Sequence, residues 1–99
     1  MQIKNILAPV DFSLSSRLAL AHASALSQSF QARLTVLHVV ESSVTPAFPA
    51  EAARIQKEQF RQSRKMMPGF LTQKDRENPN IKTEVRSGNA VEEIFSVAG

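Results

Sequence analysis

The sequence predicts an α/β fold built around a parallel sheet, and three observations support this. Segments with the pattern of buried strands alternate with segments of helical periodicity, in the order strand, helix, strand, helix, strand, helix. The second strand-like run is β-branched and almost continuously apolar, as strands covered on both faces are. The 99 residues are 42% hydrophobic and 21% charged, which is the size and composition of one globular domain. We therefore expect residues 1–99 to form a single βαβαβα domain with right-handed crossovers.

The first strand and the first helix are expected on either side of a polar turn. Residues 3–10 form a short apolar run that indicates a buried strand. From residue 13 to residue 30 the period becomes that of an amphipathic helix, with Ser13 as its N-cap. The helix face that we expect to be buried consists of Leu18, Ala19, His22, Ala23, Ala25, Leu26 and Phe30.

The middle of the chain predicts a second strand and a long second helix. Residues 33–40 have the pattern of a buried strand, and the Ser/Thr/Pro-rich residues 42–49 indicate a loop. A helix is expected from residue 50, kinked at Pro68 and continuing to about Lys74. Its expected apolar stripe is Ala52, Ile55, Phe60, Met66 and Met67, and its solvated face is Arg54, Lys57, Glu58, Arg61, Arg64 and Lys65.

The last quarter of the chain predicts a third strand and a third helix. Residues 75–80 indicate a polar turn, and residues 81–86 alternate apolar and polar side chains as an edge strand does. Residues 87–89 are expected to turn the chain into a helix over residues 90–98. Gly88 lies between a strand and a helix. A glycine there allows either a turn with a positive φ or the close approach of a ligand, and we favour the turn.

Composition excludes several classes of function. The chain has no cysteine and only two histidines, so disulfides, a thiolate nucleophile and a zinc site are not expected. The net charge of +3 favours phosphate-bearing partners, but the absence of Trp and Tyr argues against nucleic acid. No apolar run reaches the length of a membrane helix, and residues 1–5 do not begin a signal peptide, so we expect a cytoplasmic protein that does not bind membranes.

The candidate ligand site is the turn after the first strand. In parallel sheets, ligands bind outside the carboxyl ends of the strands, where Asp11 is expected. Its carboxylate could accept from ribose hydroxyls or help to hold a metal on a polyphosphate, and the alternative is that it caps the first helix. We interpret His22 and His38 as core residues rather than general bases. With no nucleophile elbow, GxGxxG or Walker motif, the residues themselves indicate a small α/β ligand-binding fold with no nameable catalytic residue or metal ligand.

Three stretches together resemble the universal stress protein family. Residues 6–13, ILAPVDFS, are similar to the first strand and Asp-x-Ser turn of the family, and residues 34–39, LTVLHV, to its second strand. Residues 85–94, VRSGNAVEEI, are similar to the glycine turn before its third helix. The resemblance covers nearly the whole chain. It implies a three-layer nucleotide-binding fold of the adenine nucleotide alpha hydrolase-like type and a role in the stress response.

The resemblance also implies an adenine-nucleotide site. ATP-binding members place adenosine over the ends of the first two strands. By position, Pro9, Val10 and Asp11 would line adenine and ribose, Val39 would meet adenine through its backbone, and Gly88 would border the pocket. The family's glycine-rich phosphate segment follows a fourth strand, whereas this sequence ends at Gly99. We expect a fold incomplete at its C-terminus, lacking its last two strands, and an ATP half-site that binds weakly without a nest of amides for the phosphates.

The missing strands lead to a further expectation about partners. In the family the first strand is central, so here residues 3–10 would form an apolar sheet edge, and such edges recruit partners. The resemblance implies a homodimer, for which this edge is the expected contact. The alternative is a dimerisation or interaction module of the same fold that has lost nucleotide binding. An ATP-using enzyme of a related α/β family ranks below both, because no base, nucleophile or phosphate loop can be named.

Overall fold

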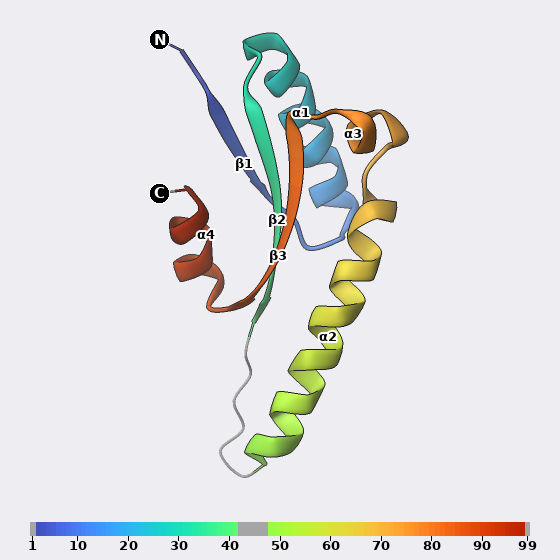
Figure 1. The fold of residues 1–99 in the computed structure, drawn as a ribbon, viewed down its shortest axis with the longest axis vertical. Coiled ribbons are helices and arrows are strands. Elements are labelled where there is room, and N and C mark those ends of the chain that lie inside the picture. The colour runs from blue at the N-terminus through green and yellow to red at the C-terminus, as the bar shows by residue number, and fades with distance from the viewer. Residues whose placement is uncertain (1, 42–47, 99) are drawn as a thin grey trace.

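The computed structural model describes residues 2–41 and 48–98 and confirms the α/β arrangement (Figure 1). Its three strands form one parallel sheet in the order β1-β2-β3. The elements, in chain order, are β1 (Asn5–Pro9), α1 (Leu14–Phe30), β2 (Arg33–Glu41), α2 (Pro49–Phe70), α3 (Gln73–Glu77), β3 (Ile81–Gly88) and α4 (Ala90–Ala98).

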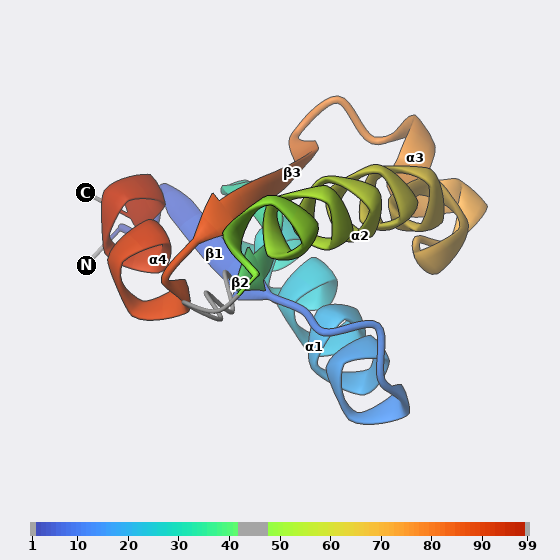
Figure 2. The same ribbon diagram turned by 90° about the horizontal axis from the view of Figure 1, so that it is seen from below.

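The helices form two layers, with the sheet between them. Figure 2 shows α1 and α2 on one side of the strands and α4 on the other. Consecutive residues of β3 confirm this, because successive side chains of a strand point to opposite faces. Ser87 accepts a hydrogen bond from Gln56 of α2 at 2.7 Å, whereas Arg86 reaches Glu93 of α4 at 3.5 Å. The predicted three-layer order is therefore correct.

The middle strand, β2, forms the centre of the core. It pairs with β1 over residues 33–37 and with β3 over residues 34–41. Leu34, Val36 and Leu37 are 0% exposed. Alternating side chains of β2 point to the α1 and α2 layer and to the α4 layer, so the strand is covered on both faces, as its continuous apolar sequence predicts.

The face of α1 that packs on the sheet differs from the predicted one. Leu20, Ser24 and Ser27 are buried, whereas Leu18 is 60% exposed and Leu26 is 50% exposed. The predicted apolar face was therefore wrong: its other members include the exposed His22 and Phe30.

Internal hydrogen bonds explain why serine side chains are buried on α1. Ser24 Oγ donates to Asp75 Oδ1 at 2.7 Å, and Ser27 Oγ donates to the Ala32 carbonyl at 2.6 Å. Burial of a polar group costs little when the group is paired, and a small side chain lets the helix approach the sheet. Apolar periodicity ignores such pairs, so it selected the wrong face.

The α2 helix also differs from its prediction in its boundaries and its stripe. It begins at Pro49, whereas the prediction placed this residue in the loop and began the helix at residue 50. Proline is tolerated in the first turn of a helix. The rest of the predicted loop, residues 42–47, lies outside the described residues. Ile55 and Met66 are each 51% exposed, and the face that packs inward is Ala52, Gln56, Phe60, Ser63, Met67 and Phe70.

The predicted continuation of this helix to Lys74 was wrong. Leu71 is extended, with φ −83° and ψ 149°, which ends α2 at Phe70. Thr72 then caps a separate short helix, α3, by accepting from the Asp75 amide at 3.1 Å. Residues 75–77 are therefore helical, where a turn was predicted, because a threonine hydroxyl starts a new helix at this point.

The β3 strand is longer than predicted, at its carboxyl end. Ser87 and Gly88, expected in a turn, continue the strand and pair with Val40 and Glu41 of β2. The turn is confined to Asn89, whose side chain accepts from the Glu92 amide at 3.2 Å and begins α4 as predicted.

The corrected face of α1 leads to a prediction about stability. Leu20→Ala should reduce the free energy of unfolding by about 2–5 kcal/mol, because it empties a buried position. Leu18→Ala, the matched control on the same helix, should change it by less than about 0.5 kcal/mol. Urea unfolding followed by circular dichroism measures both, and a larger loss for Leu18→Ala would contradict the packing of α1 described above.

Candidate functional site

The carboxyl ends of the three parallel strands lie at one edge of the molecule. Pro9, at the end of β1, is opposite Leu37, and Gly88, at the end of β3, is opposite Glu41. Val39 lies between these positions along β2. The edge predicted from the sequence therefore contains all the predicted site residues, with β2 separating Gly88 from the residues of β1 and its turn.

Val10 holds the start of the turn in place through its backbone. Its side chain is 6% exposed and lies in the core cluster. Its amide donates to the Leu37 carbonyl, and its carbonyl bonds to Nδ1 of His38, each at 2.7 Å. A carbonyl only accepts, so Nδ1 of His38 is the donor in this bond. Val10 thus positions the residue that follows it.

Asp11 is exposed and is held as a carboxylate by the turn. Its Oδ1 accepts from the Ser13 amide at 3.0 Å, and its own amide lies 3.4 Å from Ser16 Oγ. Hydrogen bonds from the side chain and then the backbone of Ser13 lower the pKa of Asp11 from 3.8 to about 2. Asp11 therefore does not cap α1 itself, because Ser13 is the N-cap, as predicted. Asp11 instead supports the turn by accepting from the Ser13 amide.

Phe12, which was not among the predicted site residues, packs from this turn against the hydrophobic core. Its φ of 65° is unusual for a bulky residue, and it turns the chain between Asp11 and the helix. The ring lies 4.4 Å from the His38 ring and 5.4 Å, edge to face, from the Phe70 ring, centroid to centroid. The Arg17 side chain lies over the Phe70 ring, with its guanidinium carbon 5.2 Å from the ring centroid.

His38 is half-buried within this cluster rather than enclosed in the core. Together with Phe12 it links the ends of β1 and β2 to α2. An almost continuously apolar strand gives no sign that one of its members will contact a turn some 26 residues earlier in the chain. Only the fold brings these residues together.

The backbone of Val39 faces the space beyond the end of β1. The Arg33 amide donates to Lys4, and the Leu37 carbonyl accepts from Val10, so odd-numbered residues of β2 direct their backbone toward β1. Because β1 ends at Pro9, the same alternation directs the Val39 amide and carbonyl past that end. This direction is compatible with the backbone role that the family resemblance implied.

Gly88 adopts a conformation that favours glycine. Its φ is +145°, and a Cβ there would lie 3.4 Å from Glu93 Cγ. Glu93 is in turn 3.5 Å from Arg86, which also pairs with Glu84 at 3.5 Å. Gly88 therefore lets α4 approach β3 beside this ion-pair cluster. It has the positive φ expected from the sequence, but at the last position of the strand rather than in a turn.

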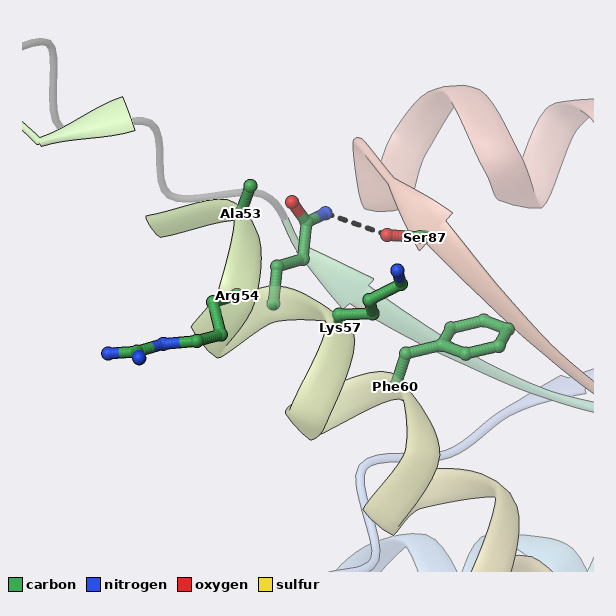
Figure 3. Close-up of a pocket in the computed structure, with 6 residues that line it drawn as sticks. Ala53, Arg54, Lys57, Phe60 and Ser87 are labelled. Carbon is green, nitrogen blue, oxygen red and sulfur yellow. Dashed lines mark hydrogen bonds between the residues drawn. The ribbon is translucent and has the colours of Figure 1, made fainter. Parts of the chain in front are cut away.

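A cavity of about 560 Å³ lies on the α2 side of the same edge. Figure 3 shows its Lys57 amine and Phe60 ring beside the hydrogen bond from Gln56 to Ser87. This cavity was not predicted, although the helical spacing of residues 53, 56, 57 and 60 places them on adjacent positions of α2. Its lining residues are Ala53, Arg54, Gln56, Lys57, Phe60 and Ser87.

Two kinds of site are not found in the described part of the chain. Over residues 2–41 and 48–98, no three His, Asp or Glu side chains gather as a metal site would require. Over the same ranges, no helix has the length and hydropathy needed to cross a bilayer.

The fold and this edge define a class: small parallel α/β domains that present a βα turn and strand ends to a ligand. Comparison with known sequences gives the family. A sequence model of the universal stress protein family matches residues 2–99, and the chain belongs to that family. A search of curated proteins gave no significant match.

Two solved structures are similar to this one. The universal stress protein UspA from Lactobacillus plantarum is 30% identical, with a TM-score of 0.79 over 99% of this chain and 70% of its own. The hypothetical protein MJ0577, whose structure was described as a test case of assigning biochemical function from structure, is 22% identical. Its TM-score is 0.76 over 99% of this chain and 68% of its own, and it supports the fold alone.

The low pKa of Asp11 leads to a prediction about acid stability. Folding lowers the pKa from 3.8 to about 2, so the ionised carboxylate stabilises the fold fully above about 3.8, and this contribution disappears as the pH falls through about 2. The difference in unfolding free energy between the protein and Asp11→Asn should therefore shrink over that window.

Carbon-13 NMR of the Asp11 carboxyl provides the direct measurement. We expect a titration midpoint near 2 in the folded protein and a higher one in Ser13→Ala, which lacks the largest contributor to the shift. A midpoint at 3.8 in the unsubstituted protein would show that the turn does not hold the carboxylate as described.

Proposed function

We propose that the protein is a cytoplasmic stress-response module that binds the adenosine part of an adenine nucleotide, ATP among them, at the carboxyl edge of its sheet. The observation that carries the proposal is that the exposed carboxylate of Asp11 and the outward-directed backbone of Val39 both lie at this edge. Membership of the universal stress protein family supports a nucleotide site at this edge. No catalytic residue is part of the proposal.

The two groups offer complementary chemistry. A carboxylate accepts charge-assisted hydrogen bonds from ribose hydroxyls, and Asp11 has acceptor capacity beyond its bond to Ser13. The Val39 amide and carbonyl supply one donor and one acceptor for the edge of a base. Pro9 adds an exposed apolar surface at the end of β1. In the proposed site, Val10 positions Asp11, and Gly88 borders the far side.

Phosphates contribute little in this proposal. The family's glycine-rich phosphate segment does not occur within the 99 residues, and backbone amides of that kind are what receive a polyphosphate. Affinity should thus come from adenine and ribose and be nearly the same for adenosine and for ATP.

Titration calorimetry with adenosine and with ATP tests the nucleotide proposal. We expect weak binding of both, reduced about tenfold or more by Asp11→Ala, which corresponds to about 1.4 kcal/mol for the lost carboxylate contacts. The control Glu77→Ala removes an exposed carboxylate from α3 and should leave binding unchanged. If neither nucleoside nor nucleotide binds, the interaction-module alternative is favoured instead.

We also propose that the protein forms a homodimer through β1. Even-numbered residues of β1 bond to β2, as Val10 and Lys4 do, so the Asn5 and Leu7 amides face away from the sheet. Pro9, in the same outward series, has no amide hydrogen, as is typical of edge strands. Within the described residues β1 is the end of the sheet, and a second copy of β1 could satisfy these groups.

Sedimentation analysis over a concentration series tests the dimer. Asn5→Pro removes an outward amide from an exposed residue without breaking the ladder to β2, so it should weaken dimerisation about tenfold or more. Asn5→Ala keeps the amide and should dimerise like the parent. A monomer at every concentration, or equal weakening by both substitutions, would rule out pairing through β1.

A further inference from the structure

One side of α2 overhangs β3 and forms a groove with it. Two hollows adjoin along this side and share Phe60. The first, of about 560 Å³, extends from Lys57 to Ser87, near the end of β3. The second, of about 370 Å³, extends from Arg64 to Thr83 and Val85. A half-buried aromatic ring thus lies in the floor, with a cation about one helical turn to either side.

The cations that line the two hollows are Arg54, Lys57 and Arg64, and they differ in their ion pairs. Within the described residues, Arg54 pairs with Glu51 at 3.8 Å and Arg61 with Glu58 at 2.6 Å. Lys57 and Arg64 form no ion pair with any residue of ranges 2–41 and 48–98. Lys57 and Arg64 thus bring positive charge that lacks a carboxylate partner to the hollows beside β3, where an acidic ligand would be complementary.

The strand below these cations has an open edge. The Asn80 carbonyl accepts from the Leu34 amide at 2.8 Å, so even-numbered residues of this segment bond to β2. The odd-numbered residues Thr83 and Val85 then direct their amides and carbonyls away from the sheet. No described strand pairs with that side of β3.

We propose that an extended acidic segment of a partner protein binds in this groove by adding a strand to β3. Its backbone would bond to the outward groups of Thr83 and Val85, which is a known mode of peptide recognition. Two acidic side chains four residues apart would pair with Lys57 and Arg64, and an apolar one midway between them, on the same strand face, would pack on Phe60. Lys57 and Arg64 are about 10.5 Å apart along the helix axis. This distance is longer than the rise of two strand residues and shorter than the rise of four.

Fluorescence anisotropy provides the test, with a labelled peptide that carries glutamate, valine and glutamate at positions i, i+2 and i+4, and therefore on one face of a strand. Saturable binding is expected, weakened about tenfold or more in the double variant Lys57→Gln/Arg64→Gln. The double variant Lys65→Gln/Lys74→Gln removes the same charge from other exposed positions and should bind like the parent. Equal loss in both pairs would overturn the proposal in favour of unspecific charge attraction.

The open strand edge needs a separate substitution. Thr83→Pro removes one outward amide from an exposed residue and leaves the β2 ladder intact, so peptide binding should fall, while Thr83→Val should retain it. If Thr83→Pro does not fold, hydrogen exchange in the parent replaces it: the peptide should protect the Thr83 and Val85 amides. An oligothymidylate that binds as tightly as the peptide, or absence of protection, would overturn strand addition.

Discussion

The complete burial of β2 is the constraint on which the rest of this small fold depends. The strand is hydrogen-bonded on both sides and covered on both faces, with three of its side chains fully removed from water. A parallel sheet is stable only when both faces are covered, so α1 and α2 must lie on one side and α4 on the other. The carboxyl ends of the three strands are thereby brought to one edge, where the turn at Asp11 and the end of β3 form the proposed ligand site.

The order and type of the elements followed from sequence because they depend on local pattern. Two apolar runs, one alternating run, one N-cap serine and the spacing of turns were sufficient to locate the three strands and the three longer helices of the described residues. The buried face of α1 could not be derived in this way. Ser24 and Ser27 are buried because each finds an acceptor, one of them 51 residues away at Asp75, and no periodicity within the helix contains that information.

The candidate site shows the same division. Position relative to the strand ends was enough to place the predicted residues on one edge, and Asp11 and Ser13 interact within a short turn that sequence can indicate. The cluster of Phe12, His38 and Phe70 joins three elements, so only the packed fold assembles it. The groove beside β3 depends likewise on how far α2 overhangs the strand, a property of packing rather than of either segment.

The strand order has a consequence for how the chain folds. Because the sheet order repeats the chain order, each strand pairs with a neighbour that is already synthesised. The β1-α1-β2 unit can form first, and β3 then adds to the edge of β2. Each strand pairing therefore closes a loop between segments that are neighbours in the sequence. A ribosome-bound chain of this topology can begin to bury β2 during translation, which shortens the time that its most apolar segment spends exposed to other nascent chains.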